Sequence, residues 1–209
     1  MLVLEQENQA LFDGIQEKNL LRQYDLLTNC IEIGLSQGGR VFDKYMLWDL
    51  NHVAVANISQ FGGRFREEPI YVGTHKPPHF RDVPGLMDQF ISTVHENWYN
   101  WSPTQLAAYG LWRLNWIHPF IEGNGRTAAC YYLLCTRSGG LIGGRKIVPE
   151  RIRENRAPYI AALTAAGRAW EIGDLDFSDM EDYLAGLVQD QLQDDNGLPH
   201  HGDAAPISK

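Results

Sequence analysis

Apolar residues recur at helical spacing along most of this 209-residue chain, and one stretch rich in proline interrupts them. The spacing predicts an amphipathic helix from about Phe12 toward Gly34. It predicts a second helix from the N-cap residue Asp43 to a point before Gly62. The apolar residues at helical spacing resume over residues 87–98. No internal repeat accompanies it, so the pattern limits the fold to an all-α class with one irregular insertion.

The second half of the chain carries clear helix start signals. Ser102, followed by Pro103 and then Gln105, forms a capping box that predicts a helix to about Trp116. Another helix is expected from near residue 124 to the glycines at 139 and 140. Prolines at 149 and 158 suit two more helix starts, and a second capping box spans residues 178–181.

The interruption lies between residues 69 and 80. Ile70, Tyr71 and Val72 are strand formers, but prolines flank them at 69, 77 and 78. Proline lacks the N–H that a central strand donates, so the stretch predicts a short β-hairpin or an edge strand.

Composition excludes several classes of protein. Hydrophobic residues make up 44% and charged residues 21%, as in ordinary globular domains, and the formal charge of -8 disfavours a nucleic-acid binder. The start of the chain has no signal-peptide pattern, and no apolar run approaches the ~20 residues of a membrane span. Cys30, Cys130 and Cys135 form no C-x-x-C pair and are interpreted as reduced thiols. A cytoplasmic protein without a membrane or nucleic-acid partner is expected.

The aromatic run formed by tryptophans at 98, 101, 112 and 116 is interpreted as a core stripe, because Trp112 and Trp116 are four residues apart on one predicted helix. Three parts of the chain are predicted: an N-terminal helical segment over 1–42, a main domain over 43–193, and a polar, disordered tail over 194–209. The tail contains His200 and His201, but two adjacent histidines without a third ligand do not predict a metal site.

The most unusual segment runs from His118 to Arg126, as HPFIEGNGR. Gly123 and Gly125 allow the backbone to turn successive N–H groups into an anion-binding concavity, which leads into the N-terminus of the next helix. Arg126 adds a planar cation for phosphate oxygens. Glu122 would repel bare phosphate, unless it holds Mg²⁺ between phosphate oxygens. A neutral histidine can accept a hydroxyl proton.

Each of these parts has a simpler explanation when taken alone. A single histidine is more often packed or solvated than catalytic, and glycine turns before helices are common. Phe120 is most simply a core anchor that pins the loop. A plain turn would not require an acid, an amide and an arginine among its glycines, so the combination favours phosphoryl or nucleotidyl transfer.

The run resembles the signature of the Fic family, His-Pro-Phe-x-Asp/Glu-Gly-Asn-Gly-Arg, which continues with a second Arg three positions later. The segments 61–66 and 70–78 resemble the arginine-containing approach and the hairpin flap of that family, and 158–163 resembles its helix after the motif. The resemblance spans about residues 43–192. It implies a Fic-type helical bundle with one short hairpin before the motif loop.

The resemblance also implies the chemistry. His118 would deprotonate the hydroxyl of a Tyr, Thr or Ser in a target protein, which would receive AMP from ATP, and Glu122 would bind Mg²⁺. The nucleotide-binding set would be Phe120, Gly123, Asn124, Gly125 and Arg126, with Arg126 on the β-phosphate. The flap residues Ile70, Tyr71, Val72 and Gly73 would align the target segment by strand addition.

Two positions depart from the family pattern. Ala129 occupies the place of the second arginine, which grips the γ-phosphate in the family. Weaker ATP binding, another phosphate donor, or a Fic-fold binding module without turnover are the alternatives. Ala129 is expected either to leave the third phosphate without a contact or to face a packed helix interface. Thr28 and Glu32 match part of the inhibitory Ser/Thr-x-x-x-Glu pattern, but Ile33 does not, so Glu32 is interpreted as an ordinary helix residue. Control by a separate inhibitory protein is one alternative, and absence of control is the other.

Overall fold

The computed structural model describes residues 8–196, except residues 74, 124–125 and 141–145. The described residues are predominantly helical, as the apolar spacing predicts. The elements are α1 (Gln9–Gln37), η2 (Gly38–Val41), α2 (Lys44–Ala54), η3 (Phe80–Asp82), α3 (Val83–Glu96), α4 (Pro103–Ile117), α5 (Arg126–Ser138), α6 (Val148–Glu154), α7 (Arg156–Glu171) and α8 (Ser178–Asn196). The sequence predicts a tail over 194–209, but α8 includes residues 194–196; the rest of the predicted tail lies outside the described residues.

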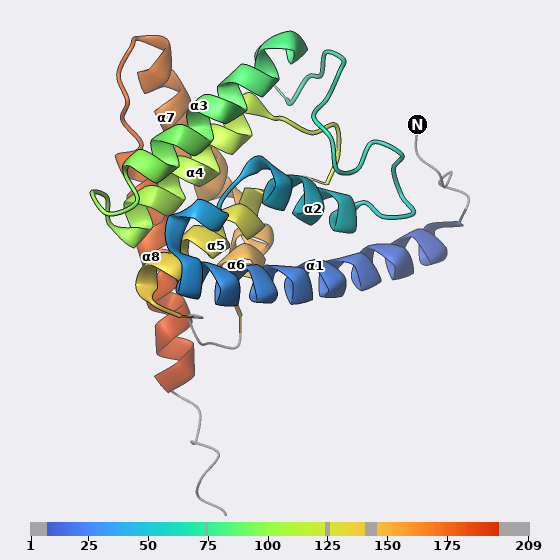
Figure 1. Cartoon of the computed structure of the whole chain (residues 1–209), viewed down its shortest axis with the longest axis horizontal. Helices are drawn as coiled ribbons and strands as arrows, with labels where there is room; N and C mark the ends of the chain where they lie inside the picture. The colour runs from blue at the N-terminus through green and yellow to red at the C-terminus, as the bar shows by residue number, and fades with distance from the viewer. Residues whose placement is uncertain (1–7, 74, 124–125, 141–145, 197–209) are drawn as a thin grey trace, which may run out of the picture.

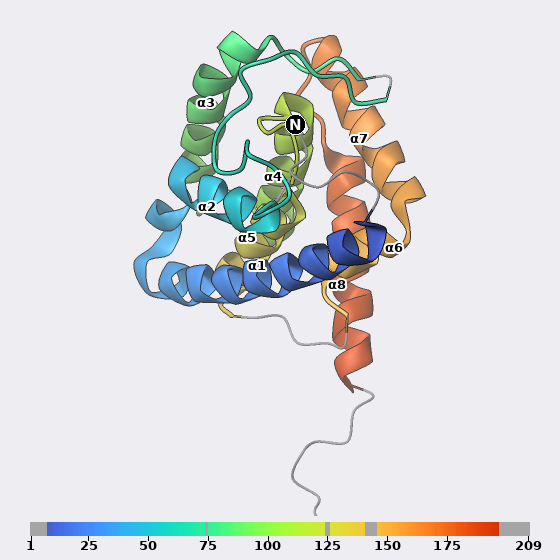
Figure 2. The same cartoon turned by 90° about the vertical axis from the view of Figure 1, so that its right-hand side faces the viewer.

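Helices α4 and α5 form the centre of the molecule, and they pack against each other along much of their length. Figures 1 and 2 show the surrounding helices in two views: in Figure 2, α2 and α3 lie to the left of this pair and α6, α7 and α8 to the right, while α1 crosses from left to right. The burial explains the arrangement, because α4 is buried almost continuously from Leu106 to Leu114. A helix that is apolar on nearly every side requires neighbours on nearly every side.

Local signals place the helix starts. The Asp43 side chain accepts a hydrogen bond from the Met46 N–H, and the reciprocal capping box of Ser102 and Gln105 is present. The start of α8 differs from the prediction. There the Asp176 carboxylate accepts the Ser178 N–H at 2.9 Å, so the hydrogen bond at this helix start comes from two residues earlier than the predicted serine cap.

The close approach of α1 to α5 explains why a glycine occupies position 34. A Cβ at Gly34 would overlap the hydroxyl of Tyr132 and the methyl group of Thr136, so a larger residue would require these side chains to shift. This contact places α1 directly against the helix that follows the His118–Arg126 loop.

The predicted hairpin does not form strands in the described residues. Between Pro69 and Phe80 there is one antiparallel bridge, in which Val72 and His75 exchange N–H···O bonds of 3.2 and 2.9 Å. The flanking prolines supply no N–H to extend it, and side chains hold the segment instead. The His75 ring nitrogen lies 2.9 Å from the Trp116 carbonyl, at the end of α4.

The aromatic run does lie in or against the core, as predicted, with Trp98 and Trp112 buried and Trp101 and Trp116 partly buried. All three cysteines are free thiols, and burial raises the pKa of Cys130 well above its ordinary value. No helix in the described part of the chain is long and apolar enough to cross a membrane.

Candidate functional site

His118 ends helix α4. Its backbone is left-handed (φ 50°, ψ 64°), and its N–H binds the Leu114 carbonyl at 3.0 Å. A left-handed residue commonly closes a helix, although the position usually belongs to glycine or asparagine. The side chain is only 5% exposed. The chain therefore turns sharply at His118 and enters the loop between α4 and α5 with the imidazole largely shielded from water.

Phe120 anchors this loop in the core. It is 4% exposed, and its ring centroid lies 5.9 Å from that of Phe65. The placement agrees with the anchor interpretation of Phe120. It leaves the main chain of Phe120, and not its ring, for contact with a ligand.

Gly123 is required by the geometry of the loop. Its φ is 64°, and a Cβ there would overlap Cγ1 of Val55, the residue that follows α2. Glu122, immediately before it, is half-buried. Asn124 and Gly125 lie outside the described residues. Arg126 begins α5, and its side chain is also outside the described part.

Arg66 fastens the start of the loop. It is 3% exposed, and its Nε donates to the His118 carbonyl at 2.8 Å, while its own N–H donates to the Pro119 carbonyl at 2.8 Å. The guanidinium also donates to the carbonyls of Ile117, Glu68 and Pro78. Burial lowers the pKa of Arg66, but a guanidinium stays protonated. A cation at the carbonyl end of α4 is favourable, and here it ties the flap segment to the histidine.

Asn51 fastens the other end of the loop. This α2 residue is 1% exposed, and its Nδ2 donates to the carbonyls of Glu122 (2.7 Å) and Gly123 (2.8 Å). Its Oδ1 accepts the N–H of Gly63 at 2.9 Å. The buried Asn51 amide therefore joins the motif loop to the segment that contains Gly63.

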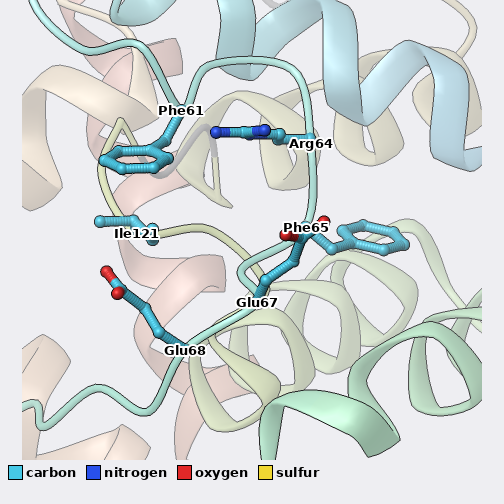
Figure 3. A pocket seen from close by; sticks show the side chains of 6 residues that line it. All are labelled: Phe61, Arg64, Phe65, Glu67, Glu68 and Ile121. Carbon is cyan, nitrogen blue, oxygen red and sulfur yellow. The ribbon is translucent and has the colours of Figure 1, made fainter.

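A small pocket of about 240 Å³ opens beside the loop. Figure 3 shows its lining, which is Phe61, Arg64, Phe65, Glu67, Glu68 and Ile121. The Arg64 guanidinium lies over the Phe61 ring at 5.0 Å. Ile121 is the variable position of the HPFIEGNGR run, so the pocket borders the loop directly, and its lining combines two carboxylates, one guanidinium and apolar groups.

The flap residues lie at the surface, before and at the single bridge. Ile70 is half-buried, Tyr71 is 80% exposed, and Val72 and Gly73 are exposed. The segment thus presents side chains and backbone to solvent next to the end of α4.

Ala129 is fully buried in the core on α5, which agrees with the packed-interface alternative. Glu32 lies on the exposed face of α1. That position fits its interpretation as an ordinary helix residue.

Sequence reasoning missed the role of two residues. Arg66 was noticed only as part of the 61–66 run, and nothing local suggested that its guanidinium binds the end of α4. Asn51 had one available signal, which is a polar residue inside the apolar stripe of α2 between Leu50 and Val55.

A model of the Fic/DOC family matches residues 41–135, which contain Asn51, Arg66, the flap residues and the His118–Arg126 loop. Over these residues the chain is similar to the Fic/DOC family, which confirms the resemblance seen in the motif. Proteins named protein adenylyltransferase Fic are similar to it: that of Drosophila persimilis is 35% identical over 131 residues, and that of Drosophila erecta is 35% identical over 133. Each alignment covers 58% of this chain and 25% of the relative, so the chain spans about a quarter of the length of these relatives.

Solved structures share the fold. A Fic domain containing signaling protein from Bacteroides thetaiotaomicron superposes with a TM-score of 0.67 at 18% identity, covering 85% of this chain and 71% of that one. A Fic family protein from Desulfovibrio desulfuricans gives a TM-score of 0.61 at 19% identity, covering 87% and 56%. Fic-1 from C. elegans gives 0.59 at 20% identity, covering 80% and 48%. The helical arrangement is therefore that of Fic proteins.

Proposed function

We propose that this chain transfers AMP from ATP to a Tyr, Thr or Ser hydroxyl of a target protein, with His118 as the general base. The carrying observation is the loop between α4 and α5, where a shielded imidazole, a carboxylate and a glycine with a left-handed backbone follow within six residues. The similarity to proteins named protein adenylyltransferase supports the same activity.

In the proposed reaction the target hydroxyl oxygen bonds to the α-phosphorus while His118 accepts its proton. The bond from the α-phosphorus to the bridging oxygen breaks, and pyrophosphate leaves. Gly123, Asn124, Gly125 and Arg126 would hold the phosphates by backbone N–H groups and the guanidinium. Phe120 would contribute by fixing the loop from the core.

Glu122 would hold Mg²⁺ as a single protein ligand. In the described part of the chain, no three His, Cys, Asp or Glu side chains gather into a metal cage. A lone half-buried carboxylate nevertheless fits this ion, because Mg²⁺ usually combines one or two carboxylates with phosphate oxygens and water. The bound ion would neutralise charge on the phosphates.

The exposed edge near Tyr71 and Val72 would dock an extended segment of the target. Addition of a strand to this edge would supply main-chain hydrogen bonds and leave the target hydroxyl near His118. The tie between His75 and the Trp116 carbonyl holds that edge next to the end of α4.

Incubation with labelled ATP, Mg²⁺ and candidate targets tests the activity. The wild type should label protein, and His118→Ala should lose labelling by ~100-fold or more while retaining nucleotide affinity. His79→Ala, at an exposed histidine outside the loop, should label normally. Equal labelling by His118→Ala and the wild type would contradict the assignment.

Calorimetry tests the metal. ATP affinity should fall when EDTA replaces Mg²⁺, and Glu122→Gln should remove most of that difference. Glu171→Gln, on the exposed end of α7, should retain it. Identical affinities with Mg²⁺ and with EDTA in the wild type would exclude this role for Glu122.

One observation favours a second candidate, a Fic-fold module that binds nucleotide without turnover. Ala129 is fully buried where the family carries an arginine, so this position offers no cation to the third phosphate. Binding of ATP with no transfer to any target would support this alternative. Control by a separate inhibitory protein is also proposed, since Glu32 is exposed and Ile33 departs from the inhibitory pattern within the chain.

A further inference from the structure

We infer that Asn51 of α2 is a positioning residue that turns the Glu122–Gly123 peptide so that the Gly123 N–H faces the phosphates of the nucleotide. The inference rests on the proposed function. Asn51 lies outside the motif, 71 residues before Glu122, and would act through the loop without touching the substrate.

The hydrogen bonds of Asn51 leave its amide a single orientation. Nδ2 has two N–H donors, and both carbonyls that it faces, of Glu122 and Gly123, lie within 2.8 Å. Oδ1 faces an N–H, that of Gly63. A reversed amide would set an oxygen against two carbonyls and an NH₂ against an N–H, so the network assigns the donor side.

This orientation decides which way the loop presents its polar groups. The C=O and the N–H of a trans peptide point in opposite directions. Because Asn51 binds the Glu122 carbonyl on the α2 side, the Gly123 N–H is directed away from α2. The reversed peptide would present a carbonyl oxygen there, which repels phosphate.

Packing prevents the loop from relaxing toward α2. Gly123 already lies so close that a Cβ would overlap Val55, and Gly62 approaches the same side chain from the other segment. Asn51 and Val55 therefore form a rigid support beneath the loop. Packing against Val55 limits where the loop can lie, and the Asn51 amide determines which way the Glu122–Gly123 peptide points.

Asn19 provides a matched comparison within the same chain. It is also 1% exposed, and its Nδ2 also donates to two carbonyls, those of Ala54 (3.4 Å) and Ala56 (2.7 Å). These bonds join α1 to the end of α2. Asn19 therefore makes the same kind of hydrogen bonds as Asn51, but at a helix contact that does not include the motif loop.

The experiment compares Asn51→Asp with Asn19→Asp. Each change replaces a donor by a carboxylate oxygen, and Asn51→Asp keeps an acceptor for Gly63. Both proteins should melt at lower temperature. Calorimetric Kd values for Mg²⁺–ATP and for inorganic pyrophosphate should weaken by about 10-fold or more in Asn51→Asp, as expected for loss of a backbone N–H contact to an anion. Asn19→Asp should stay within about 2-fold of wild type, because it keeps the loop contacts.

A second readout follows the peptide itself. With glycine labelled for NMR, pyrophosphate should shift the Gly123 amide signal in the wild type and in Asn19→Asp. It should leave this signal nearly unmoved in Asn51→Asp. If Asn51→Asp fails to fold, Asn51→Ala replaces it, and its anion affinity should still fall by about 3-fold or more, because the donor is lost.

Wild-type anion affinity in the folded Asn51 variant would overturn the inference. So would equal losses in the Asn51 and Asn19 variants, since a structural role predicts that pattern. Binding of pyrophosphate without ATP binding or transfer would defeat the proposed function alone, and the pyrophosphate comparison would then decide the role of Asn51. Failure of the wild type to bind either anion would overturn both.

Discussion

Two buried arginines, Arg66 and Arg113, are held in opposite ways. Arg66 donates to main-chain carbonyls on the segment before α3 and at the end of α4. Arg113, on α4, lies between the rings of Trp116 and Trp170 at 4.5 and 4.4 Å, and its Nη1 has no hydrogen-bond partner among the described residues. Burial lowers the pKa of both.

The difference shows what each region requires. Hydrogen bonds are directional, so Arg66 determines where the backbone beside His118 lies. Cation–π contacts tolerate displacement, so Arg113 mainly fills an aromatic layer between α4 and α7. Neither forms one of the two ion pairs found among the described residues, Lys44–Asp88 and Lys146–Glu154. The region around His118 therefore depends on directional hydrogen bonds. The tryptophan region, which is Arg113 with Trp116 and Trp170, depends on filling space in the core.

The largest effect is expected from a third buried arginine that has neither main-chain carbonyls nor aromatic rings arranged around it. Ala129→Arg should lower the free energy of unfolding by about 3–5 kcal/mol, because it overpacks the core and buries an unpaired charge. Urea unfolding measures this, with Ala161→Arg at an exposed site of α7 as the control. A stable Ala129→Arg that binds triphosphate about 10-fold more tightly would show instead that Ala129 faces the nucleotide.

Removal of the carbonyl-bound arginine should have the next largest effect. Arg66→Met should cost about 3 kcal/mol of stability, since several buried carbonyls lose a charged donor. It should also reduce transfer, because the backbone of His118 is released. Arg66→Lys should recover part of both. Denaturation and labelling assays on the same samples check this, and unchanged transfer in a folded Arg66→Met would mean that the hydrogen bonds of Arg66 do not position His118.

The matching change in the tryptophan region should be milder. Arg113→Met should alter stability by about 1 kcal/mol or less, because lost cation–π attraction is offset by relief of a buried cation. Nucleotide binding and transfer should match the wild type. A large loss of transfer in Arg113→Met would show that the two regions are coupled.

The smallest expected effect lies at the edge of the tryptophan region, where Asp176 binds the Ser178 N–H. This hydrogen bond lowers the pKa of the Asp176 carboxyl below its ordinary 3.8. The ionised group therefore contributes stability above the unfolded pKa, and this is lost as the pH falls through the lowered folded value. Asp176→Asn should melt slightly below wild type at pH 7 and equal to it in strong acid. A difference independent of pH would exclude the charge as its cause.

Local interactions explain why much of this protein could be predicted. Helix starts at Asp43 and Ser102 depend on bonds spanning three residues, and helical stripes depend on contacts spanning four. The His118–Arg126 run is likewise contiguous. Its histidine, carboxylate, glycines and arginine can therefore be recognised from the sequence alone. The hairpin was a weaker inference, because pairing needs N–H groups that the prolines around Ile70 withhold.

The sequence by itself determined the helical class, the helix starts and the chemistry present in the motif loop, because each depends on neighbours a few residues apart. Only the tertiary structure decided how the loop is held. Arg66 meets His118 across 52 residues and Asn51 meets Glu122 across 71, and both contacts exist because α2 and the 61–68 segment pack against the loop. The packing of α5 against α4, α1 and α6 likewise buries Ala129. Burial and long-range hydrogen bonding are properties of the assembled core, and no local pattern specifies them.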